Sequence, residues 1–316
     1  NPPYQEMDGG NSASAKPLYN KFVSFAKMLC PNYLSMIMPA RWFAGGRNLD
    51  DFRNMMLNDR SIRLLSDFPN GRSCFPNTYI AGGVCYFLSD KFYQGKCTVR
   101  NTFKDKKSTS IRDLNEYDVF IRLNEALSIV KKVLSKNEEK LVGLVSSQRP
   151  YGLRTYYRGS EESLENNVRL YTSDGISYIK RTEVTALQEH IDKYKVMLSR
   201  ADSGHPIEEV SEGKLANVIC QGKVLYPNEV CTETWLSIGA FDTLIEAENL
   251  LKYLNSRFVR FLLLQALTSI MVTNTMFQFV PLQDFSKSWT DKELYAKYGL
   301  SDDEIAFIES MIKPME

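Results

Sequence analysis

The sequence opens on four residues whose types and spacing suit one kind of chemistry, Asn1-Pro2-Pro3-Tyr4. Proline fixes φ, so the two prolines stiffen this loop, and Pro3 offers no amide donor that would compete for the Pro2 carbonyl. The Asn1 side-chain oxygen and the Pro2 carbonyl are then two acceptors in one preorganised loop. Tyr4 adds a flat face for stacking. Together they suit a planar ring with an exocyclic amine, whose hydrogen bonds to both acceptors would direct its lone pair toward an electrophile.

Helical and strand patterns alternate along the chain through about residue 90. Helices are predicted at residues 14–29 and 48–57, and strands at residues 33–39, 61–68 and 79–89. Pro31 and Asn32 end the first helix. Strands that alternate with helices at short spacing are typical of βαβ units, so we expect a largely parallel sheet.

The pattern becomes polar and basic after residue 90. Between Lys91 and Arg112 there are seven Lys or Arg and one acidic residue, although the whole chain carries 39 basic and 38 acidic residues. A local basic stretch can bind a polyanion even when the total charge is near zero. We interpret residues 91–110 as a strand followed by a loop. The predicted phosphate contacts in this loop are Lys104, Lys106 and Lys107, and the alternative is a disordered, solvated loop.

Helices dominate the end of the chain. Residues 125–137 predict an amphipathic helix, and residues 242–267 predict either two consecutive helices or one long broken helix. Two capping boxes begin further helices, Thr290 with Glu293 and Ser301 with Glu304. We place a domain boundary between residues 110 and 111. An α/β part lies before it, and a mixed α+β part with carboxy-terminal helices lies after it.

Composition excludes several classes of protein. The six cysteines form no C-x-x-C pair and there are only two histidines, so neither a metal site nor a secreted disulfide scaffold is expected. No apolar run reaches the roughly 18 residues that span a membrane. The first residues are polar and turn-forming rather than a signal peptide. A soluble, reduced, cytoplasmic protein is the simplest account.

The quoted motifs together resemble a known family, the S-adenosylmethionine-dependent methyltransferases that modify amino groups. "NPPY" is the form common in its adenine-N6 DNA methyltransferases, and "P.RW", "FR..ML", "FP" and "GGVCYF" recur after it. "RPYGLRT" and "VCTETWLSIGAF" are similar to methylase subunits of bacterial restriction–modification systems. The resemblance covers nearly the whole chain.

The resemblance implies a fold and a mechanism. Residues 1–110 would be the carboxy-terminal half of a Rossmann-like methyltransferase sheet, and residues 111–316 a target-recognition domain. The donor would be S-adenosylmethionine, and the partners double-stranded DNA and a restriction endonuclease subunit or domain. The enzyme would flip an adenine out of the duplex. Asn1 and the Pro2 carbonyl would accept hydrogen bonds from the adenine amine, and Tyr4 and Phe75 would sandwich the ring, without a metal or a covalent intermediate.

Sequence recognition would belong to the second part of the chain. Arginine side chains can hold phosphates or read guanine in the major groove. The alternative for this segment is an exposed β-hairpin with ordinary charges. The candidate arginines are Arg149, Arg154 and Arg158, interleaved with Tyr151, Tyr156 and Tyr157.

One family motif is missing from the sequence. The glycine motif that binds the methyl donor precedes NPPY in the family, and no G-x-G follows a strand here. We therefore expect a carboxy-terminal part of such an enzyme that is inactive alone. One alternative is a DNA-binding specificity module without catalysis. Another is a methyltransferase for a glutamine amide or an RNA base, although such enzymes usually lack a recognition region of this length.

Overall fold

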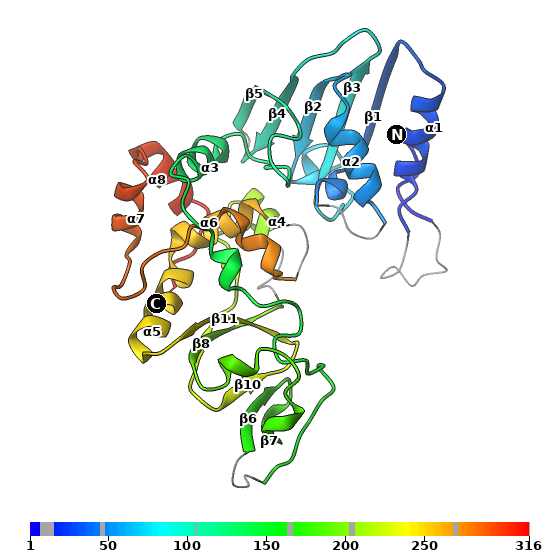
Figure 1. Cartoon of the computed structure of the whole chain (residues 1–316). Coiled ribbons are helices and arrows are strands. Elements are labelled where there is room, and N and C mark those ends of the chain that lie inside the picture. The colour runs from blue at the N-terminus through cyan, green and yellow to red at the C-terminus, as the bar shows by residue number, and fades with distance from the viewer. Residues whose placement is uncertain are drawn as a thin grey trace. The chain divides into compact units, whose positions relative to one another are not determined.

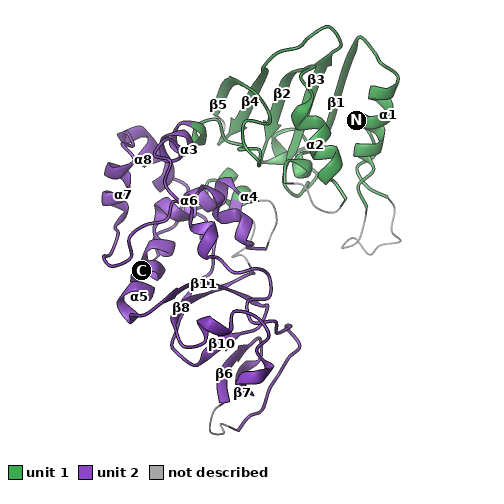
Figure 2. Cartoon of the chain, in the orientation of Figure 1, with its two compact units in different colours: residues 1–127, 207–214 green, residues 128–206, 215–316 purple. Residues whose placement is uncertain are grey.

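The structure of the chain is a computed structural model. It describes residues 1–6, 16–44, 48–104, 106–162, 167–201, 206–267 and 271–315. Two compact units make up the chain, unit 1 (residues 1–127 and 207–214) and unit 2 (residues 128–206 and 215–316) (Figure 2). The units divide at residues 127–128, later than the expected boundary at 110–111, and the short segment 207–214 returns to unit 1.

Unit 1 is built on one five-stranded sheet (Figure 1). Its strands, in the order β1-β3-β2-β4-β5 across the sheet, are β1 (Tyr33–Pro39), β2 (Ile62–Phe68), β3 (Val84–Asp90), β4 (Cys97–Phe103) and β5 (Lys106–Arg112). Its helices are α1 (Tyr19–Met28), α2 (Asp50–Asn58) and most of α4 (Pro206–Ser211), with short 3₁₀ helices at Ala40–Phe43 and Gly71–Ser73. Each helix and strand predicted up to residue 90 is therefore present, but the predicted strand at 79–89 begins only at Val84 and the predicted helix at 14–29 begins at Tyr19, with residues 14–15 outside the described part of the chain.

The expectation of a largely parallel sheet is wrong. Strand β3 pairs antiparallel with both β1 and β2, and β4 pairs antiparallel with β5, whereas β2 and β4 are parallel. The reason lies in loop 69–83, which joins β2 to β3 without a long crossover helix, so that β3 returns beside β2 with Phe68 opposite Val84. The basic stretch also differs from expectation, because residues 106–112 form strand β5 of a hairpin rather than a loop.

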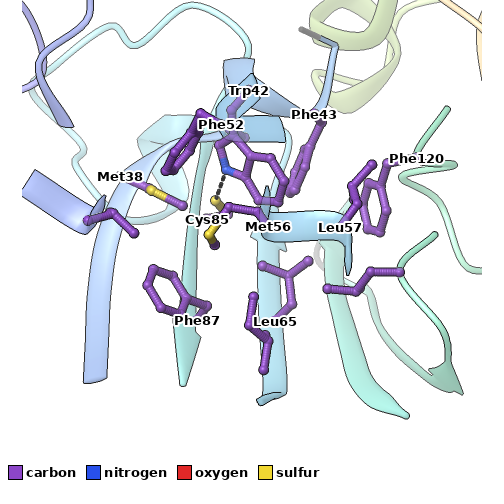
Figure 3. Close-up of a cluster of buried hydrophobic side chains, with 14 of the residues drawn as sticks. Met38, Trp42, Phe43, Phe52, Met56, Leu57, Leu65, Cys85, Phe87 and Phe120 are labelled. Atoms are coloured by element: carbon purple, nitrogen blue, oxygen red, sulfur yellow. Dashed lines mark hydrogen bonds between the residues drawn. The ribbon is translucent and has the colours of Figure 1, made fainter. Parts of the chain in front are cut away.

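The hydrophobic core of unit 1 contains side chains from helices α1 and α2 and from the sheet (Figure 3). Trp42 is fully buried, donates its Nε1–H to Cys85 Sγ over 3.3 Å and meets Phe52 edge to face. Phe87 and Leu65 are fully buried on β3 and β2. Each such side chain contributes about 1.5–3 kcal/mol when it leaves water. The strands on either side of loop 69–83 are thus firmly anchored.

Helix α1 buries a narrower face than its sequence indicates. Tyr19 and Val23 are buried, but Phe22, Phe25 and Leu29 are 44%, 65% and 82% exposed. The helical spacing of the apolar residues therefore predicts the helix correctly, while the described part of unit 1 covers only part of its apolar surface.

Unit 2 contains two three-stranded sheets and a group of helices (Figure 1). The sheets have the orders β10-β6-β7 and β11-β8-β9. The strands are β6 (Asn167–Thr172), β7 (Gly175–Lys180), β8 (Tyr194–Ser199), β9 (Lys223–Leu225), β10 (Glu229–Cys231) and β11 (Trp235–Phe241). The α-helices are α3 (Ala126–Leu134), which begins at the unit boundary, α5 (Leu244–Asn255), α6 (Arg257–Gln265), α7 (Asp291–Lys297) and α8 (Asp302–Glu309). Short 3₁₀ helices lie at Leu141–Leu144, Arg181–Glu183, Gln188–His190 and Asn274–Phe279.

The predicted helices of this unit are confirmed. Residues 242–267 form two consecutive helices, α5 and α6, which meet at Ser256. Both capping boxes are present, at the starts of α7 and α8. Among the described residues, no helix has both the length and the apolar character needed to cross a membrane.

Candidate active site

The loop of residues 1–6 lies against the start of α1. The Tyr4 carbonyl accepts a hydrogen bond from the Leu18 amide over 3.1 Å, and the Glu6 amide donates to the Lys16 carbonyl over 2.9 Å. Two backbone bonds to a neighbouring segment hold the loop in one conformation. The stiffness expected from the two prolines is thus reinforced by pairing.

Asn1 and Tyr4 differ in exposure within this loop. The Pro2 ring is buried, whereas the Asn1 side chain is exposed and can meet a ligand. Tyr4 is half-buried, and its hydroxyl has no hydrogen-bond partner among the described residues. Burial first, and then the thiols of Cys85 and Cys74, raise the pKa of Tyr4. A buried polar group without a partner is one that a bound ligand can satisfy.

Phe75 follows Cys74, whose thiol is, after burial, one of the causes that raise the pKa of Tyr4. Phe75 is half-buried, its amide donates to the Gly71 carbonyl over 2.9 Å, and its carbonyl accepts from Thr78 over 3.0 Å. The structure therefore brings the NPPY loop and the Phe75 segment, about 70 residues apart in the chain, to one part of unit 1.

A buried ion pair joins the two ends of loop 69–83. Arg122 donates Nη2–H to Asp67 Oδ1 over 2.6 Å and Nε–H to Asp67 Oδ2 over 3.0 Å. Asp67 is fully buried at the end of β2. The same guanidinium donates Nη1–H to the Gly82 carbonyl over 2.9 Å. A bidentate pair of this kind fixes orientation as well as charge, so it fixes the position where the loop rejoins the sheet.

Glu208 also forms two hydrogen bonds with this loop. Its Oε1 accepts from the Gly82 amide over 2.6 Å, and its Oε2 accepts from the Tyr79 hydroxyl over 2.6 Å. The hydrogen bond to this carboxylate is the main cause that raises the pKa of Tyr79 to about 12. Both polar groups of Gly82 are therefore engaged, one by Glu208 and the other by Arg122.

The three predicted lysines lie at the β4–β5 hairpin. Lys104 sits at its tip in a left-handed conformation, φ 49°, with Nζ 5.6 Å from the centre of the Phe103 ring. Partial burial, together with the charge of Lys106, lowers the pKa of Lys104. Lys106 and Lys107 are exposed on β5. The alternative of a disordered loop is wrong for these residues, since the hairpin gives them fixed backbone positions.

The three predicted arginines of unit 2 already have protein partners or neighbours. Arg149 Nε lies 2.8 Å from Glu233 Oε2, and Arg158 Nε lies 2.7 Å from Asp174 Oδ2. Partial burial acts to raise the pKa of Glu233, but the hydrogen bond from Arg149 and the charge of Arg154 help to hold it below its ordinary value. Arg149 and Arg154 are thus brought together around one carboxylate.

The tyrosines of the same segment do not share one role. Tyr151 is fully buried, and its hydroxyl is 2.9 Å from Ser237 Oγ. Tyr157 donates to Glu183, while Tyr156 is 73% exposed. The segment forms irregular turns, so the β-hairpin alternative is wrong. Of the three rings, Tyr156 is the one open to a ligand.

Sequence reasoning misses Asp67, Arg122 and Glu208. An acidic residue inside the apolar run of β2 is the one usable signal, because a buried carboxylate requires a partner. Nothing local identifies Arg122 as the partner of Asp67, since 55 residues separate the two. Nothing local identifies Glu208 as the partner of Gly82 either, since 126 residues separate them.

Comparison with known proteins identifies a family that matches the residues of this loop. Residues 1–75, which contain Asn1, Tyr4 and Phe75, match the model of the Eco57I restriction-modification methylase family. The expected resemblance is confirmed over these residues. An uncharacterized adenine-specific methylase of Mycoplasma pneumoniae is 36% identical over 135 residues, which are 41% of this chain and 32% of that protein. The chain thus spans about a third of the length of this curated relative.

Two solved restriction enzymes also match the structure at low similarity. The type IIG restriction endonuclease BpuSI aligns with 89% of this chain and 47% of its own, at 9% identity and a TM-score of 0.32. The type IIL restriction-modification enzyme MmeI, solved in complex with DNA, aligns with 77% of this chain and 38% of its own, at 8% identity and a TM-score of 0.36.

Proposed function

We propose that this chain carries the base-accepting and DNA-reading parts of an adenine-N6 DNA methyltransferase of a restriction–modification system. The observation that carries the proposal is the half-buried Tyr4 hydroxyl of the NPPY loop, which has no hydrogen-bond partner among the described residues and whose pKa is raised by burial and by the thiols of Cys85 and of Cys74, the neighbour of Phe75. The family match over the same residues supports it. We assign residues 1–110 to the catalytic part and residues 111–316 to target recognition, in the cytoplasm, with a restriction endonuclease as partner.

The oxygens and rings at the NPPY loop fit the methyl acceptor. The exposed Asn1 amide oxygen and the Pro2 carbonyl would accept both protons of the adenine amine, which turns its lone pair out of the ring plane. Tyr4 and Phe75 would hold the flipped ring between them, and base–aromatic stacking contributes about 1–3 kcal/mol per base. Flipping costs a few kcal/mol, so stacking on two faces offsets it.

The same groups are compatible with a positively charged donor. Neutral oxygens and an aromatic face can lie beside a sulfonium without charge repulsion. Tyr4 and Asn1 are the residues that would border S-adenosylmethionine, which supplies an electrophilic methyl group when bound. Their part is to orient the amine and to exclude water from it.

The test uses the complete gene product with tritium-labelled S-adenosylmethionine and mixed-sequence duplex DNA, followed by analysis of the nucleosides. We expect label in N6-methyladenine, its loss in Asn1→Ala, and its retention in Gln5→Ala, which removes an exposed amide from the same loop. Label in protein or RNA, with DNA unlabelled, would overturn the assignment. Duplex binding without methylation would instead favour the specificity-module alternative, which the arginines of unit 2 support.

A further inference from the structure

A polar hollow of about 340 Å³ lies beside loop 69–83 in unit 1. Strands β2 and β4 are parallel, with Asp67 opposite Asn101, so both end at this edge of the sheet. The hollow is therefore bordered by the loop after β2, the hairpin tip after β4 and segment 207–214. Its lining includes Asn70, Ser73, Thr102, Lys104, Ser211 and Glu212.

The lining is rich in hydrogen-bond donors. Ser73 and Thr102 contribute hydroxyls, Asn70 an amide and Lys104 an ammonium group. Of the three lysines of the hairpin, Lys104 is the one among the described lining residues, whereas Lys106 and Lys107 follow it on β5. Donors of these types are the ones that bind phosphate oxygens in protein–DNA complexes.

The acidic member of the lining is already compensated. Glu212 Oε2 lies 2.9 Å from Lys214 Nζ. This bond and the charge of Lys214, aided by Arg72, lower the pKa of Glu212. Arg72 and Lys106 add further positive charge near the hollow, because Arg72 acts on Glu212 and Lys106 acts on Lys104. An anion that enters therefore meets Lys104, while Glu212 is engaged by Lys214 and acted on by Arg72.

We propose that this hollow binds one backbone phosphate of DNA next to the nucleotide whose base stacks on Phe75. Ser73 precedes Phe75 by two residues, so under this proposal the phosphate bound at Ser73 would flank the nucleotide whose base Phe75 holds. The inference rests on the proposed function and adds to it a binding site for one phosphate of the DNA strand. The phosphate positions the strand, while Phe75 and Tyr4 receive the base.

The experiment measures the anisotropy of a fluorescein-labelled, mixed-sequence duplex with the full chain over a range of salt concentrations. Lys104→Gln should lower the slope of log K against log[salt] by about one, the value for one lost phosphate contact. Lys91→Gln is the matched control, because Lys91 is exposed and follows β3 at the opposite end of the sheet. Its slope should stay closer to that of the unaltered chain.

A second pair of variants tests the hollow without touching a lysine. Ser73→Asp places a negative charge at the exposed rim and should weaken binding about tenfold at low salt, whereas Ser73→Asn should change it little. Equal slopes for Lys104→Gln and Lys91→Gln, or equal affinities for the two Ser73 variants, would overturn the phosphate site while leaving DNA binding intact. An unaltered chain that binds no duplex would overturn the proposed function, and the site with it.

Discussion

Two loops of this molecule, one in each unit, each form hydrogen bonds to a glutamate from a distant part of the chain. Glu208 holds loop 69–83 through the Tyr79 hydroxyl and the Gly82 amide. Glu233 holds segment 149–158 through the Arg149 guanidinium and, over 3.3 Å, the Thr155 amide. In both cases one carboxylate oxygen accepts a hydrogen bond from a side chain, and the other accepts one from a backbone amide.

The two loops differ in which groups the glutamate binds. Glu208 bonds to groups that are not predicted to touch DNA, so Phe75 remains available while its loop stays fixed. Glu233 instead occupies Arg149, one of the predicted DNA contacts. In unit 1 the supporting residues are therefore separate from those proposed to contact DNA, whereas in unit 2 the proposed DNA contact Arg149 is itself paired with Glu233. The exposed fraction of the Arg149 side chain is 44%, so the ion pair opposes that exchange by no more than about 1 kcal/mol.

The largest expected effect concerns the support of loop 69–83. Arg122→Met leaves the fully buried Asp67 carboxylate without its bidentate partner, which should lower the free energy of unfolding by about 3–5 kcal/mol. Arg158→Met is the matched change in unit 2, where the two side chains of the pair are 49% and 61% exposed, and should lose under about 1 kcal/mol. Urea unfolding measures both. Similar losses would show that the two units do not differ in this way.

The next effect separates two adjacent glycines of the same loop. Gly82 and Gly83 have φ of 78° and 77°. A Cβ at Gly83 would collide with the carbonyl oxygens of Phe68 and Pro69, whereas one at Gly82 would meet no described atom within 4 Å. Gly82→Ala should therefore lose only the left-handed strain of about 1–2 kcal/mol, and Gly83→Ala should lose at least about 1 kcal/mol more. Equal midpoints of thermal unfolding would contradict the close approach at Gly83.

Local signals in the sequence account for much of the fold. The capping boxes at Thr290 and Ser301 predict helices α7 and α8 because the reciprocal bonds join residues three apart. Residues 242–267 divide into two helices at Ser256, whose hydroxyl caps the second. The NPPY loop likewise carries its acceptors and its ring within four residues, so the site could be proposed from composition and spacing.

The remaining features depend on contacts that no local pattern encodes. Strand β3 inserts between β1 and β2 because loop 69–83 turns the chain back, and alternation of strands and helices cannot show that return. Segment 149–158 has spacing that suits a hairpin, yet Tyr151 packs into the core and Gly152 takes a φ of 79°, which breaks any regular strand. Glu208 reaches its partners only because segment 207–214 returns to unit 1.

A spectroscopic prediction tests the Glu208 contact directly. Because its neutral form donates to Glu208, Tyr79 has a pKa of about 12 instead of 10.0. A pKa raised on folding stabilises the native state below pH 10.0, and that contribution is lost as the pH rises through about 12. Glu208→Gln should lower the pKa of Tyr79 toward 10.0. The measurement is the tyrosinate absorbance as a function of pH, with the curve of a Tyr79→Phe variant subtracted to isolate Tyr79. Glu209→Gln, the neighbouring change on α4, should leave it in place.

The smallest effect lies in unit 2 and tests whether Arg149 is shared between protein and DNA. Glu233→Gln weakens its ion pair, so duplex affinity should rise by about threefold at low salt while the unfolding free energy falls by less than about 1 kcal/mol. Glu189→Gln removes the same charge from a carboxylate that is 72% exposed and contacts His190 instead of a predicted DNA residue. If Glu233→Gln and Glu189→Gln raise duplex affinity equally, the gain comes from the change in net charge and not from the release of Arg149. If Glu208→Gln raises it as much as Glu233→Gln, the two glutamates play the same part, and the contrast between the loops fails.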